Sequence, residues 1–126
     1  MTAYTSIVAV REVLPGKPLG TSVPISVRTG ILMGWGAAVA APWPMPVAAV
    51  FSATTGTGRA GVARRALVCA GIGIAGIVGI LIEPNTYDVG SWTPPTRRAV
   101  FAHTAACAVL AAVGIVRYSQ SSRAEV

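Results

Sequence analysis

The stretch that decides the fold reads ALVCAGIGIAGIVGILI, residues 66–82, and contains no charged side chain. Two further charge-free stretches flank it, at residues 29–58 and 99–116. An α-helix needs about 20 mostly apolar residues to cross a hydrocarbon core roughly 30 Å thick, and flanking arginines extend a shorter run because their side chains reach the interface. We therefore predict an all-α integral membrane protein with three transmembrane helices, at about 31–53, 66–83 and 97–117.

The composition of the 126-residue chain agrees with a membrane location, because hydrophobic residues make up 53% and charged residues only 11%. A soluble domain carries about 25% charged residues. A water-soluble enzyme, a disordered tail and a dedicated nucleic-acid binder are therefore disfavoured. The single lysine and single asparagine indicate the codon bias of a GC-rich bacterial genome. We expect a multi-pass protein of a bacterial cell membrane, with the lipid bilayer and no nucleic acid as a partner.

The regions outside the predicted spans are short. Residues 1–28 lack the apolar core of a signal peptide, and we interpret them as a peripheral segment, either an interfacial helix or a flexible tail. Residues 29–117 form the three-helix domain, and residues 118–126 a short polar tail. The basic residues divide evenly between the two sides, so the positive-inside rule leaves the orientation open. The basic cluster before residue 66 favours a cytoplasmic 54–65 loop.

The first predicted span contains an elbow rich in proline, with Pro42, Pro44 and Pro46 at alternate positions. Each proline lacks an N–H, and its ring clashes with the carbonyl four residues earlier. The pattern predicts two half-helices, about 31–41 and 47–53. Carbonyls freed within hydrocarbon need partners, so the elbow should face other helices, a partner chain or a wet cavity. Such breaks frame sites in transporters, but a kinked packing helix is the favoured interpretation.

The glycines at residues 71–76 match the pattern GxGxxG of dinucleotide-binding units. That fold also needs a long following helix, further strands and an acidic residue about 20 positions later. Here Glu83 and Pro84 interrupt the helix, and residues 89–124 contain no acidic side chain. The glycines therefore do not indicate a nucleotide site, and no cofactor is predicted.

Small residues in the central span predict close helix packing instead. Gly71, Ala75 and Gly79 recur at helical spacing, and Gly73 and Gly76 widen the ridge that they form. In lipid, small residues let two backbones approach closely enough for dispersion to hold them together. We predict that this span packs against the third span or against its own copy, in a homo-oligomer or a larger membrane complex.

Polar and aromatic side chains gather between the second and third spans. The third helix is expected to begin with Thr96 as its N-cap. The predicted interface anchors are Tyr87, Trp92, Arg64 and Arg65. The predicted polar rim consists of Glu83, Asp88, Arg97, Arg98 and His103.

Ionisable residues within a span indicate a function by default, and a histidine with a carboxylate relays protons near neutral pH. The favoured interpretation is nevertheless structural: the carboxylates pair with Arg97 and Arg98 to fix the loop, and His103 bonds a backbone carbonyl. Cys69 and Cys107 lack the spacing of metal ligands, so no metal site is predicted.

The sequence therefore favours a non-enzymatic membrane subunit, with a role in assembly or regulation, that acts through helix packing. The alternative is a small homo-oligomeric transporter or channel in which Glu83 and His103 handle protons or a cation. A third, weaker hypothesis is an enzyme acting on a lipid-like substrate at the polar rim.

Overall fold

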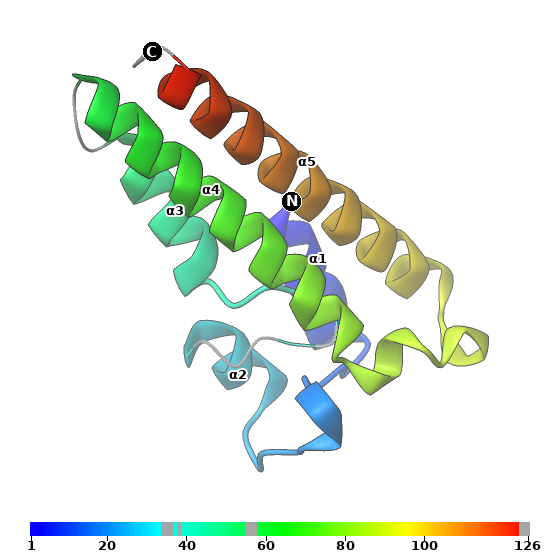
Figure 1. Cartoon of the computed structure of the whole chain (residues 1–126). Helices are drawn as coiled ribbons and strands as arrows, with labels where there is room; N and C mark the ends of the chain where they lie inside the picture. The colour runs from blue at the N-terminus through cyan, green and yellow to red at the C-terminus, as the bar shows by residue number, and fades with distance from the viewer. Residues whose placement is uncertain (34–36, 38, 55–57, 124–126) are drawn as a thin grey trace.

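The computed structural model describes residues 1–33, 37, 39–54 and 58–123. These residues form α-helices and short 3₁₀ turns and no β-strand, so the predicted all-helical class is confirmed (Figure 1). The five α-helices are α1 (Thr2–Arg11), α2 (Val27–Met33), α3 (Pro44–Thr54), α4 (Gly58–Leu81) and α5 (Pro94–Arg123).

Two helices of the described chain, α4 and α5, are long and apolar enough to cross a membrane. Their 24 and 30 residues correspond to about 36 and 45 Å at 1.5 Å per residue. They lie side by side and antiparallel (Figure 1). Within their apolar windows, only 22% of the α4 residues and 28% of the α5 residues are buried, so most of this surface faces outward.

The first predicted span falls on two separate helices, α2 and α3, in agreement with the predicted break into two half-helices. Of the predicted half-helix over 31–41, residues 31–33 are helical, residues 37 and 39–41 are not, and residues 34–36 and 38 lie outside the described part. Ala37 and Ala40 instead exchange two backbone hydrogen bonds of 3.0 and 3.2 Å. The backbone N–H and carbonyl groups of Ala37 and Ala40 are therefore not available for the i→i−4 hydrogen bonds of an α-helix.

Prolines begin α3 instead of breaking it. The first i→i−4 hydrogen bond runs from the N–H of Val47 to the carbonyl of Trp43, at 3.2 Å. Pro44 and Pro46 fall in the first turn, where the backbone N–H groups have no helical partner in any case. The second half-helix therefore begins three residues before its predicted start at residue 47.

The N-cap of α5 differs in the same way from the sequence prediction. The N-cap residue is Thr93, not Thr96. The Oγ1 of Thr93 accepts a hydrogen bond from the backbone N–H of Thr96 at 3.3 Å. Pro94 and Pro95 occupy the first two helical positions. The prediction placed the cap three residues late because proline is tolerated inside the first turn.

The N-terminal helix α1 packs against α5 at the end that leads into the 82–93 loop (Figure 1). One face of α1 joins α2, α5 and the 37–40 segment in a small apolar core. The buried members of this core are Val8, Ala9, Ile31, Val39, Ala40, Ala99 and Val100. The segment that the sequence assigns to the periphery thus includes a helix with a buried face.

Candidate functional site

The helices α4 and α5 approach so closely that glycine is needed at the contact. A Cβ built on Gly73 would lie 2.5 Å from the backbone nitrogen of Ala111 and 2.6 Å from the carbonyl oxygen of Cys107. A Cβ on Gly76 would overlap the sulfur of Cys107. Because backbone atoms cannot move aside, a side chain at Gly73 would push the two helices apart.

Helix α5 supplies a matching glycine one turn beyond Ala111. A Cβ on Gly114 would overlap the backbone nitrogen of Ala70 and would lie 2.7 Å from the carbonyl oxygen of Ala66. Ala66, Ala70 and Ala111 are themselves buried. The antiparallel pair is therefore joined by glycine and alanine on both sides, which is the pattern of helices that associate in lipid.

The predicted packing residues divide between two faces of α4. Gly73 and Gly76 face α5, whereas Gly71, Ala75 and Gly79 are exposed. A Cβ on Gly71 or Gly79 would meet nothing within 4 Å. Because helical residues two positions apart point about 200° away from each other, one ridge cannot contain all of these glycines.

Among the predicted rim residues, Glu83 is deeply buried, with 4% of its surface exposed. Its Oε2 accepts the backbone N–H of Lys17 at 2.8 Å, and its Oε1 accepts the side-chain amide of Asn85 at 3.1 Å. A further hydrogen bond of 2.9 Å runs from the N–H of Leu19 to the carbonyl of Ile82. Glu83 therefore fastens the N-terminal 15–20 loop to the end of α4.

The other rim residues lie apart from this carboxylate. Asp88, Arg97 and Arg98 are exposed, and no hydrogen bond joins Glu83 to either arginine in the described structure. His103 is buried and bonds a different element. Sequence reasoning missed the partners of Glu83 because a backbone N–H has no residue signature, and the only available signal was the single asparagine two residues later.

The aromatic residues of the same loop hold backbone carbonyls. The hydroxyl of Tyr87, which is 67% exposed, donates to the carbonyl of Leu81. The half-buried indole of Trp92 donates its N–H to the carbonyl of Asn85 at 2.9 Å. Both residues thus present one polar atom and a large apolar ring at one end of the α4–α5 pair.

At the opposite end of the pair, α4 carries the two predicted basic anchors. Arg64 is exposed, while Arg65 is half-buried and donates from Nε to the carbonyl of Gly61 at 3.2 Å. The C-terminal end of α5 lies at this same end (Figure 1).

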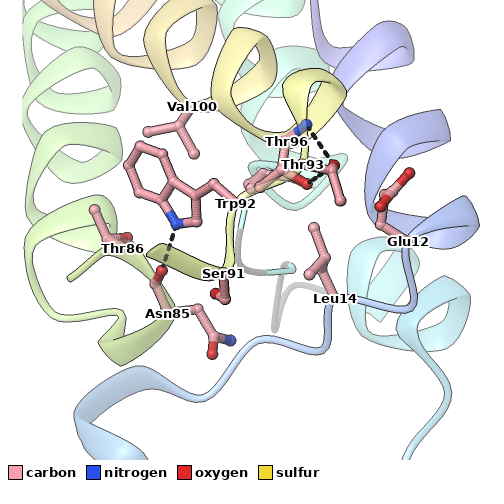
Figure 2. A pocket seen from close by; sticks show the side chains of 10 residues that line it. Glu12, Leu14, Asn85, Thr86, Ser91, Trp92, Thr93, Thr96 and Val100 are labelled. Atoms are coloured by element: carbon pink, nitrogen blue, oxygen red, sulfur yellow. Dashed lines mark hydrogen bonds between the residues drawn. The ribbon is translucent and has the colours of Figure 1, made fainter. Parts of the chain in front are cut away.

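A polar cavity of about 160 Å³ lies between the 85–93 loop, the first turns of α5 and the 12–14 segment (Figure 2). The Oγ1 of Thr86 is buried here without a hydrogen-bond partner among the described residues. The Oγ1 atoms of Thr93, just before α5, and Thr96, in its first turn, lie 3.0 Å apart and line the same cavity. The cavity has room for several waters, which would satisfy this hydroxyl.

His103 projects from α5 toward the 37–40 segment. Its Nδ1 lies 3.1 Å from the carbonyl oxygen of Val39, and 9% of its surface is exposed. Because a carbonyl oxygen only accepts, the ring carries a proton on Nδ1. The side chain therefore fixes the connection between α2 and α3 against α5.

In the described part of the chain, no three side chains of His, Cys, Asp or Glu are grouped closely enough to hold a metal ion. Cys69 and Cys107 are both free thiols. Comparison of the chain with known protein families, characterised proteins and solved structures finds no match.

Proposed function

We propose that this chain is a multi-pass protein of the bacterial cell membrane that acts as a non-enzymatic subunit. It associates through its helices with copies of itself or with a larger membrane complex. In this proposal α4 and α5 cross the bilayer as a hairpin, and the 27–54 segment makes a third crossing in two short helices. The observation that carries the proposal is the outward face of α4, which is exposed and apolar and combines small with large side chains.

On that face, large apolar side chains alternate with small ones. Leu67, Ile74 and Val78 are 52%, 48% and 47% exposed, and Gly71 and Ala75 lie between them. Positions 67, 71, 74, 75 and 78 follow the helical period, so they share one side of α4. A second helix can approach closely over the small residues while the large ones pack at its flanks.

The support for a third crossing is the position of α3. This helix packs along α4 and spans 11 residues, which is about 16 Å or half of the hydrocarbon core. Its exposed side is apolar, with Val47, Val50 and Phe51 at 59%, 66% and 69% exposure. Such a surface suits lipid or a neighbouring subunit better than water.

The transporter and enzyme alternatives gain no specific support from the site. Glu83 is held by a backbone N–H and an amide, and His103 by a backbone carbonyl. Both side chains thus have a structural task, and they serve different segments.

The test of the proposed function is co-purification of the tagged chain after detergent extraction, with mass and stoichiometry measured by native mass spectrometry. We expect an assembly larger than one chain, which Gly71→Leu and Gly79→Leu disrupt. Because a Cβ at either position meets nothing within 4 Å and both glycines are exposed, we expect these variants to leave the α4–α5 pair unchanged. Ala112→Leu, on the exposed side of α5, is the matched control and should assemble normally.

Two outcomes would overturn the proposed function. One is a chain that remains single under mild extraction, or an assembly that both glycine variants leave intact. The other is a proton-coupled flux in reconstituted vesicles that Glu83→Gln abolishes while assembly persists, which would establish the transporter alternative.

A further inference from the structure

A second cavity, apolar and about 240 Å³ in volume, lies where α1, α3, α4 and α5 meet. Its walls come from the first turns of α1, residues 45–50 of α3, and the facing sides of α4 and α5. Val50, 66% exposed, stands at its rim, so the cavity opens toward the apolar outer side of α3. The outward face of α4, on which the proposed function depends, takes no part in it.

The wall is mainly apolar, and its polar side chains are those of His103, Thr2 and Thr5, together with the thiol of Cys107. The hydroxyl of Thr5 already donates to the carbonyl oxygen of Thr2, at 3.0 Å. The Nδ1–H of His103 donates to the carbonyl oxygen of Val39, so Nε2 of the neutral ring keeps a lone pair that can accept a hydrogen bond. No described residue donates a hydrogen bond to Nε2. A Cβ on Gly76 would lie 3.7 Å from this nitrogen and would overlap the sulfur of Cys107, so His103 and Cys107 both stand against this glycine.

A hydrogen-bond acceptor that faces a mainly apolar cavity gains from a donor, and such a cavity holds water poorly. The partner that suits both Nε2 of His103 and this cavity is an apolar molecule with one hydrogen-bond donor. A cavity of about 150 Å³ holds benzene, with six carbons, so the present one accommodates about ten non-hydrogen atoms. We propose that this cavity binds a lipid-soluble molecule of that size carrying one hydroxyl or phenol group, which donates to Nε2 of His103.

The probes for the test are naphthol, which has a phenolic donor, and naphthalene, which has the same rings without it. The chain has a single histidine, so isotope labelling of histidine gives one Nε2 resonance for the full-length protein in detergent micelles. We expect naphthol to shift this resonance and to bind about three- to tenfold more tightly than naphthalene, after correction for micelle partition.

Equal affinity for the two probes with an unmoved Nε2 resonance would overturn the proposal, because the cavity would then be an unspecific void. Tighter binding of naphthoate would also overturn it, since an anion would be the preferred ligand. This comparison uses the unmodified chain and does not depend on whether a variant folds. It also gives its answer whether or not the chain assembles with a partner.

A cavity-filling variant locates the bound probe. Ala106→Leu projects into the cavity and should weaken naphthol binding by about tenfold or more, because the added carbons occupy the same volume. Ala108→Leu, on the exposed side of the same helix, is the matched control and should leave the affinity unchanged. Unchanged binding in Ala106→Leu, with the helical circular dichroism of the parent, would place the probe elsewhere and refute this site.

Discussion

A single methyl group at Gly73 should separate the two long helices, whereas the same group at Gly71 should not. The Cβ of Gly73→Ala would lie 2.5 Å from the backbone nitrogen of Ala111, and ordinary contact begins at 3.4 Å. The helices must therefore move apart locally by roughly 0.9 Å, the difference between these two distances. A gap of about that size forfeits a quarter to a half of each dispersion contact across the interface.

The expected magnitude follows from two opposing effects. Overpacking costs about 1–3 kcal/mol, and replacing glycine by alanine within a helix returns about 1 kcal/mol. Gly73→Ala should therefore destabilise the α4–α5 pair by up to about 2 kcal/mol. Gly71→Ala has only the second effect and should be neutral or stabilising by up to about 1 kcal/mol. The two variants should thus differ by about 2 kcal/mol, roughly 30-fold in the unfolding equilibrium.

The assay is reversible unfolding of each variant in mixed micelles with increasing sodium dodecyl sulfate, followed by tryptophan fluorescence and helical circular dichroism. Equal stability of Gly73→Ala and Gly71→Ala would refute the packing, because the two helices would then not meet at Gly73. Gly114→Ala on α5 should behave like Gly73→Ala, since its Cβ would overlap the backbone of Ala70.

Three further variants test the loop and the helix starts. Glu83→Gln replaces one carboxylate oxygen by an amide donor, so it should lower the unfolding free energy by about 1–3 kcal/mol and raise the rate of amide exchange at Lys17. Asp88→Asn, at an exposed position, is the control and should change neither quantity. Thr93→Ala removes the cap of α5 and should lower the unfolding free energy by about 0.5–2 kcal/mol, with recovery in Thr93→Ser. Pro44→Ala should change the unfolding free energy by less than about 0.5 kcal/mol, because the first helical position needs no N–H. A loss near ~3 kcal/mol would show instead that this proline shapes the elbow.

The positions of the two long helices could be predicted because absence of charge is a property of the sequence alone. The predicted spans at 66–83 and 97–117 fall almost entirely within α4 and α5, and both helices extend further at one or both ends. The extensions at 58–65 and 118–123 contain arginines and serines, which are helical here although they are polar. Charge patterns therefore locate the apolar part of a helix and not its ends.

The choice of packing face could not be predicted, because both faces of α4 contain small residues. Gly71 and Gly79 fit a ridge as well as Gly73 and Gly76 do, and the sequence does not say which ridge meets α5. That choice depends on where Cys107, Gly114 and the intervening alanines lie on the neighbouring helix. It is decided by the shape of two surfaces together.

The polar rim illustrates a second limit. The sequence places Glu83 and His103 in one polar rim, but their position along the helices does not identify their hydrogen-bond partners. The partners are the backbone groups of Lys17 and Val39, which belong to segments folded back from the N-terminal part of the chain. The side-chain pattern predicts a backbone carbonyl as the partner of His103, but it does not say which segment supplies that carbonyl.

The central claim, that α4 and α5 cross a bilayer as an antiparallel pair, is tested most directly by cysteine labelling in intact bacterial cells. Ser91→Cys and Ser119→Cys are introduced singly into a chain whose Cys69 and Cys107 are replaced by serine; both serines are exposed, one in the loop and one near the end of α5. We predict that an impermeant thiol reagent labels only one of the two before the membrane is opened and both afterwards. Simultaneous labelling of both in intact cells, or a chain that stays monodisperse in buffer without detergent, would contradict the account.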